Sequence, residues 1–200
     1  MQTLPFAAGG YRFIKGVFQY SAGVAAERGH QIVRVQFRNP VPLAEGFKRI
    51  EEMIKKAGRP LTSFCACELR SPAPFTEAGF VAFNKIYVVE LTRWGLFDGA
   101  VNPVARSNVC PAIDPPGEPS FHAFCYTEVA DATTPSFVIA GSGETVEGKE
   151  NYRDHAIRLG DTSREGMREK ALFVIGEMER RLAAFGFGWR DTTATPGGRC

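Results

Sequence analysis

The sequence predicts an α+β protein, a two-layer sandwich in which a mixed or antiparallel sheet carries two helices on one face. Two observations predict this class. Apolar residues alternate with polar ones in several short segments, as in half-buried strands, and in two longer segments they recur with the period of a helix. The order along the chain is two strands, helix, strand, helix and two strands, which is typical of a sheet whose helices lie together.

The first strands are expected near the N-terminus. Residues 11–23 alternate aromatic or aliphatic residues with small or polar ones. A turn is then indicated at residues 27–29, and residues 32–37 resume the alternation. Two alternating runs around a glycine-containing turn predict a β-hairpin within residues 24–37.

The first helix is predicted after Pro42, where the period changes. Leu43, Phe47, Ile50 and Ile54 fall on one helical face, and Gly58 is placed to end the helix. The elements that follow are a strand over 61–70, a helix over 78–93, and strands over 105–113 and 120–130.

Composition describes a globular protein and excludes several classes. Hydrophobic residues make up 44% and charged residues 23% of the 200 residues, with a net charge of +2 whose basic groups are interleaved with acids. We therefore expect no nucleic-acid partner. No apolar run is long enough to span a bilayer, and the N-terminus lacks a leader pattern, so no membrane association and a cytoplasmic location are expected.

The five cysteines do not form a disulfide or zinc framework. Cys65 and Cys67 are predicted to share one face of a strand, but zinc sites usually need wider spacing and a second pair. We expect the cysteines to be small buried apolar residues and expect no metal site.

A boundary near residues 131–135 divides the chain into a domain over 1–130 and a C-terminal part over 131–200. Within the latter, residues 179–194 align without gaps on residues 51–66, matching helix with helix and Gly186 with Gly58. This predicts a partial repeat whose next strand begins near residue 192. The alternative is two unrelated amphipathic helices that each end at a glycine.

Arg106 stands alone in the stretch "NPVARSNVCPAI". No acid occurs within seven residues on either side of it. Such an arginine is either a surface group paired with an acid distant in the sequence, or half of an ion pair whose other half is the ligand.

Several short motifs in the N-terminal 130 residues together resemble the Rid family, the reactive intermediate deaminases also called the YjgF family. They are "PF" at 5–6, "SAG" at 21–23, "AG" at 57–58, "FNKIY" at 83–87 and "PVARS" at 103–107. Their order and spacing, rather than any single motif, carry the resemblance.

The resemblance implies a chorismate-mutase-like fold, assembled as a homotrimer with clefts between subunits. It also implies an imine or enamine deaminase that needs no metal or organic cofactor and releases ammonia and a keto acid. Arg106 falls where the family binds the substrate carboxylate. The other implied substrate-binding residues are Phe6, Ser21, Gly23, Asn84, Ser107 and Asn108.

Two departures from the family pattern bear on mechanism. Phe6 replaces the family's N-terminal tyrosine, which removes a hydroxyl. The acid that deaminating members use to hold water is missing from the penultimate strand, where the inward position is His122 if the preceding turn holds one extra residue. A neutral imidazole can take a proton from water near pH 7, so His122 is a candidate acid–base group, the alternative being a packed or surface histidine.

Two functions follow from this sequence. The first is a deaminase for a small carboxylate-bearing substrate, extending to a 2-aminomuconate-like dicarboxylate if a second basic group such as Arg93 or Arg34 assists. The second is a non-enzymatic carboxylate-binding or interaction protein of the same fold. The C-terminal part either packs on the first domain, or reaches across to a neighbouring subunit and walls its cleft, which would bring the loop "GSGETVEG" with Glu144 and Glu147 near the ligand.

Overall fold

The computed structural model describes residues 1–131, 133–149 and 151–195. Within these ranges the strands form two four-stranded sheets, ordered β1-β2-β3-β8 and β4-β7-β5-β6. The strands are β1 (Thr3–Phe6), β2 (Tyr11–Ile14), β3 (Gly23–Ala26), β4 (His30–Pro42), β5 (Phe64–Arg70), β6 (Ala105–Val109), β7 (Ser120–Val129) and β8 (Phe137–Ile139). The β5–β6 pair is parallel and the other strand pairs are antiparallel.

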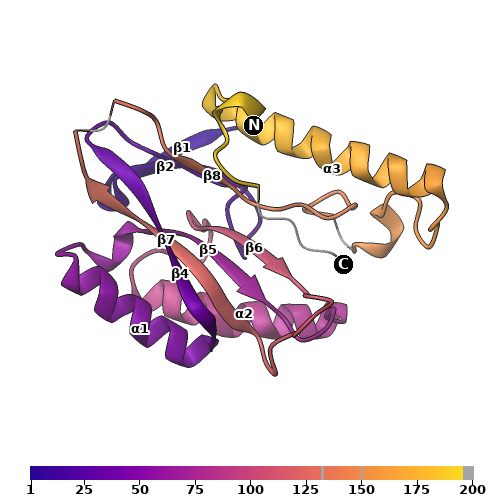
Figure 1. The fold of residues 1–200 in the computed structure, drawn as a ribbon, viewed down its shortest axis with the longest axis horizontal. Coiled ribbons are helices and arrows are strands. Elements are labelled where there is room, and N and C mark those ends of the chain that lie inside the picture. The colour runs from indigo at the N-terminus through magenta and orange to yellow at the C-terminus, as the bar shows by residue number, and fades with distance from the viewer. Residues whose placement is uncertain (132, 150, 196–200) are drawn as a thin grey trace.

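Two helices, α1 (Leu43–Lys56) and α2 (Glu77–Arg93), lie together along one face of the second sheet (Figure 1). Their apolar faces meet the sheet in an aromatic core in which the ring of Phe47 packs edge-on against Phe121. The Thr76 side chain caps α2 by accepting a hydrogen bond from the amide of Gly79. The predicted sandwich of one sheet with two helices on one face is therefore present.

The other face of this sheet is covered by the first sheet, which makes the molecule thicker than a two-layer sandwich. Tyr11 and Val24 of the first sheet pack on Cys65, Ala66 and other small residues of the second. A third helix, α3 (Arg164–Phe185), lies beyond the first sheet (Figure 1), and its last turn packs on that sheet.

The hairpin predicted within residues 24–37 is wrong. The turn forms as expected, with the amide of His30 bonded to the carbonyl of Glu27, but the strands on its two sides enter different sheets. β3 pairs with β2 and β8, whereas β4 pairs with β7 along most of its length. The turn therefore carries the chain from the first sheet to the second.

The expectation that Cys65 and Cys67 share one face of their strand is also wrong. The register of β5 against β7 shifts between Phe64 and Ala66, which rotates the strand by one position. As a result Cys65 packs between the two sheets and Cys67 packs under the helices.

The C-terminal part contains the predicted helix, but its described residues, which end at 195, do not form the strand expected from about residue 192. α3 ends at Gly186, whose φ of 82° is left-handed, and a short 3₁₀ helix (Trp189–Asp191) follows. Residues 192–195 then continue without strand pairing. Among the described residues no helix is long and apolar enough to cross a membrane.

Candidate active site

Arg106 is buried between β6 and α2. It lies on the last strand of its sheet, opposite Cys67 of β5, and only 3% of its surface is exposed. Its guanidinium carbon lies 4.7–5.9 Å from the centroids of four aromatic rings, those of Tyr20, Phe80, Phe83 and Tyr87. The π faces of these rings attract the cation and take the place of part of its water.

No carboxylate among the described residues forms an ion pair with Arg106, and its Nη1 is buried without a hydrogen-bond partner there. The surface alternative, an exposed arginine paired to a distant acid, therefore does not describe this residue. A buried N–H without an acceptor is costly, which points to an acceptor that arrives from outside the chain.

Asn84 of α2 adds a second buried polar atom without a hydrogen-bond partner among the described residues. It is fully buried, its side-chain nitrogen donates to the carbonyl of Phe80 at 2.7 Å, and its Oδ1 has no partner among the described residues. Helical spacing places it on the face that carries Phe80 and Tyr87. A buried acceptor and the buried donor of Arg106 thus both lie at α2, and together they suit a ligand with polar groups.

The sequence did not single out Tyr20, which carries one of the four rings. Its hydroxyl donates to Oε1 of Glu147 at 3.0 Å, and Oε2 of Glu147 lies 2.9 Å from Nη2 of Arg181. Burial, and then the nearby carboxylate of Glu147, raise the pKa of Tyr20 well above its usual value. Glu147 belongs to the loop expected either to pack on the first domain or to wall the cleft, and it reaches the Arg106 site within one chain.

Of three further predicted residues, Ser21 lies beside β6, whereas Gly23 and Phe6 belong to the first sheet. Ser21 is buried, donates to the carbonyl of Pro103 and bridges Ala105, so it holds the chain beside β6. Gly23 lies under α3, where an added Cβ would come within 3.2 Å of Phe185. Phe6 packs on the ring of Tyr11 instead of on Arg106.

The two residues after Arg106 are directed elsewhere. Ser107 follows Arg106 along a strand, so its side chain points to the opposite face, where it lines a cavity. Asn108 accepts a hydrogen bond from Ser71 at 3.0 Å. The structure therefore does not bring these two side chains to the aromatic rings.

His122 is separated from Arg106 by strand β5. It is the extra residue at a bulge in β7, between Phe121 and Ala123, which pair with Leu69 and Glu68. Burial and then the charge of Arg70 lower the pKa of His122, which favours the neutral ring. Its charged neighbours are those of the Arg34–Glu68 cluster, so the nearness to Arg106 expected from the sequence is not found.

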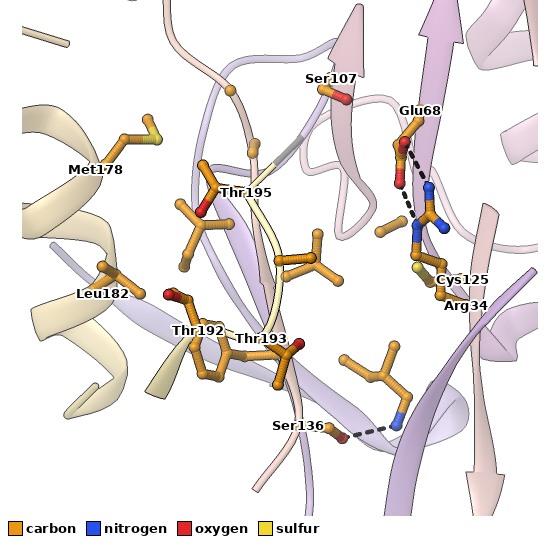
Figure 2. Close-up of a pocket in the computed structure, with 18 of the residues that line it drawn as sticks. Arg34, Glu68, Ser107, Cys125, Ser136, Met178, Leu182, Thr192, Thr193 and Thr195 are labelled. Carbon is orange, nitrogen blue, oxygen red and sulfur yellow. Dashed lines mark hydrogen bonds and ion pairs between the residues drawn. The ribbon is translucent and has the colours of Figure 1, made fainter. Parts of the chain in front are cut away.

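A cavity of about 590 Å³ lies on the opposite face of β6. Figure 2 shows Ser107 and Glu68 on one side of it, Met178 and Leu182 of α3 on the other, and Thr192, Thr193 and Thr195 between them. Arg34 lines this cavity but is held by Glu68 through two hydrogen bonds of 2.6 and 3.0 Å. Arg93 lies outside it, bonded to Glu51 and Glu90.

Comparison with known proteins identifies the family. Residues 3–196 match the model of the family described as 2-aminomuconate deaminase CnbZ. The 2-amino-5-chloromuconate deaminase of Comamonas testosteroni is 54% identical over 192 residues, which cover 95% of this chain and 76% of that protein. No solved structure matches the chain. Since the family match extends over nearly the whole chain, this protein belongs to the 2-aminomuconate deaminase family CnbZ.

Proposed function

We propose that this protein hydrolyses the C–N bond of a 2-aminomuconate-like dicarboxylate, with Arg106 as the clamp for the carboxylate beside the reacting carbon. The observation that carries this proposal is the buried guanidinium of Arg106 with an unpartnered N–H among four aromatic rings. Membership of a deaminase family favours this reading over a non-enzymatic carboxylate-binding protein.

The chemistry of the substrate suits such a site. A guanidinium grips a carboxylate through two parallel hydrogen bonds and thereby fixes the plane of the attached group. A conjugated amino-diene diacid is flat, so aromatic side chains offer it large complementary surfaces. Orientation of the substrate against a water molecule then supplies much of the rate enhancement.

The reaction consumes one water and releases one ammonia. A proton added to a carbon of the enamine gives an iminium ion. The oxygen of water bonds to the iminium carbon as the C=N π electrons move to nitrogen. The protonated nitrogen then leaves as ammonia with the C–N electron pair, and loss of the hydroxyl proton leaves the keto acid. No strong protein nucleophile is needed for these steps.

Neither of the two arginines considered for a second carboxylate faces the guanidinium of Arg106. Arg34 lines the cavity on the opposite face of β6, and both Nε and Nη2 of Arg93 are bonded to carboxylates near the surface. Arg34 is itself paired with Glu68, so a second carboxylate would have to share it or displace that acid.

Two further features of the family resemblance remain proposals. A homotrimer is supported by the outer face of α2. The apolar residues Val81, Ile86 and Val89 are exposed there, as on a helix face that packs against another subunit.

A partial repeat is supported by the ends of α1 and α3. In both places a left-handed glycine, Gly58 or Gly186, is followed at the same interval by a short 3₁₀ helix.

Ammonia release from freshly generated 2-aminomuconate tests the proposed function. We expect the protein to exceed the buffer rate, and Arg106→Ala to lower kcat/KM about 100-fold or more because charged hydrogen bonds to the substrate are lost. Arg49→Ala, which removes an exposed arginine paired with Glu45 within α1, serves as the matched control and should keep the wild-type rate.

Two other outcomes of this assay are informative. His122→Ala should stay near the wild-type rate, because β5 separates it from Arg106. A wild-type protein no faster than buffer on 2-aminomuconate and on simpler 2-imino acids would contradict the deaminase proposal.

A further inference from the structure

No acid among the described side chains of the first domain pairs with Arg106, but the C-terminal part brings an acid to Tyr20, whose ring faces Arg106. Glu147 belongs to the loop that follows β8, and 127 residues separate it from Tyr20 along the sequence. The hydrogen bond between them joins this loop to the aromatic enclosure. Tyr20 is therefore the connection between the guanidinium of Arg106 and a carboxylate.

Arg181 holds Glu147 in place from inside the protein. It is 1% exposed, and its Nη1 donates to the carbonyls of Ala140 and Gly141 at 2.9 Å each. Its Nη2 forms the ion pair with Glu147. Burying a guanidinium costs several kcal/mol unless it is paired, so this arginine fixes both the loop backbone and the carboxylate.

We propose that Tyr20 is a catalytic residue of the deaminase and that Glu147, held by Arg181, is the acceptor that drives proton transfer through it. This inference rests on the proposed function and assigns the acid–base role that the sequence had given to His122. The ring of Tyr20 lies 5.3 Å from the guanidinium carbon that is to bind the substrate carboxylate, and the proposal puts its hydroxyl at the reacting end of the substrate.

The relay returns to its starting state after each turnover. As the oxygen of water bonds to the iminium carbon and the C=N π electrons move to nitrogen, one water proton passes to the Tyr20 oxygen while the phenolic proton of Tyr20 passes to Glu147. In the second half, the same path returns that proton to the amino nitrogen. The C–N bond then breaks with its electron pair on nitrogen, ammonia leaves, and the hydroxyl proton is lost to water.

The surroundings of Tyr20 keep its hydroxyl protonated, as such a relay requires. Burial comes first among the causes that raise the pKa of Tyr20, and the charge and hydrogen bond of Glu147 add to it. Arg106 on β6 acts in the opposite direction, and Tyr152 from the same loop region acts in the same direction as Glu147. Arg181 on α3 faces Glu147 from the other side.

The test compares Tyr20→Phe and Glu147→Gln with wild type on 2-aminomuconate, measuring kcat, KM and their pH dependence. Tyr20→Phe keeps the ring over Arg106 and removes only the hydroxyl. Glu144→Gln makes the same acid-to-amide change in the same loop, at a half-exposed side chain, and is the matched control. Binding of cis,cis-muconate, a diacid without the amino group, is measured by calorimetry for each protein.

We expect both variants to lose about 100-fold or more in kcat, as general acid–base groups do, with KM and muconate affinity within about threefold of wild type. We also expect the kcat of the wild type to fall as the pH is lowered, and we expect this fall to be absent from both variants. A purely structural contact would change KM or folding and leave the shape of the pH profile unchanged.

The outcomes separate this inference from the proposed function. If wild type releases ammonia and Tyr20→Phe keeps its kcat, the relay is wrong while the deaminase stands. If wild type binds muconate but releases no ammonia above buffer, both fail. If Glu147→Gln does not fold, Tyr20→Phe still decides, because it retains the carboxylate and its ion pair with Arg181.

Discussion

In the folded protein, aromatic rings replace water around the guanidinium of Arg106, and this replacement explains why the guanidinium needs an anion. Each ring offsets part of the desolvation of the cation, by about 0.5–2 kcal/mol. Rings attract a cation but do not accept an in-plane N–H bond as a carboxylate does, and Nη1 is left without a partner among the described residues. A bound carboxylate supplies what the rings lack.

Ligand binding should therefore stabilise the folded protein through Arg106. At a concentration of cis,cis-muconate 100 times its Kd, mass action stabilises the native state by about 2.7 kcal/mol. For a protein of this size that is a rise in Tm of roughly 5–10 °C. Thermal unfolding with and without muconate measures it.

The same experiment on Arg106→Met should show no rise in Tm, because methionine fills similar space without charge. Arg49→Met removes an exposed arginine of α1 outside the site and should keep the full rise. A full muconate effect in Arg106→Met would place the carboxylate site elsewhere.

Between elements, α1 and α2 are joined at the surface by one carboxylate. Glu51 of α1 accepts hydrogen bonds from Lys55 of its own helix, from Arg93 of α2 and from the indole of Trp94. The hydrogen bond from Arg93, the largest cause, and that from Lys55 lower the pKa of Glu51 to about 2. This contact fixes the end of α2, the helix whose other residues enclose Arg106.

The sign of the pH effect follows from the lowered pKa. Glu51 contributes stability that is complete above its unfolded value, near 4.3, and is lost as the pH falls toward 2. Glu51→Gln should thus destabilise the protein at pH 7, by about 1 kcal/mol for a partly exposed ion-pair network. Urea unfolding at pH 7 and at pH 3 measures the change.

The difference between wild type and Glu51→Gln should shrink at the lower pH. Glu45→Gln, which removes an exposed acid paired to Arg49 within α1, is the control, and we expect a smaller effect from it. Equal effects of Glu51→Gln at both pH values would show that the charge of Glu51 does not matter.

Local signals in the sequence predicted the elements well but could not assign strands to sheets. Each helix has its own periodicity and stop, so α1 and α2 were found close to their limits. The turn at residues 27–29 was also found, but its sequence is the same whether the flanking strands pair or part. β4 pairs with β7, which lies about ninety residues later in the chain, and no local sequence pattern predicts that pairing.

At the scale of the whole molecule, the candidate site combines parts that are far apart in the chain. Arg106 could be predicted because an isolated arginine in a family-like motif is a local feature. Tyr20, Glu147 and Arg181 could not, because each acquires its role only through contacts with distant segments. The same reason explains His122, whose orientation depends on a bulge formed with two neighbouring strands.

The packing of α3 on the first sheet should affect kcat more than the affinity for muconate. Phe185 anchors its last turn against Ile14 and Ala25 of the first sheet. Phe185→Ala should cost about 3–5 kcal/mol through lost burial and the cavity left behind. Because Arg181 lies one turn earlier on this helix, kcat should fall while muconate still raises the Tm.

Urea unfolding and ammonia release test this prediction. Ile175→Ala, at a half-exposed position of the same helix, should change the free energy of unfolding by less than about 0.5 kcal/mol. A Phe185→Ala protein with unchanged stability and kcat would show that α3 does not hold the loop of Glu147.

The long interval between Tyr20 and Glu147 also orders events in time. A chain that folds as it is synthesised has α2 and β6 available before residue 147 has left the ribosome, and Arg181 follows later still. A nascent N-terminal part can then acquire its affinity for carboxylates before it acquires any proton acceptor. An anion that binds to such an intermediate would favour native packing around Arg106. The substrate or a related diacid would then assist the folding of the enzyme that acts on it.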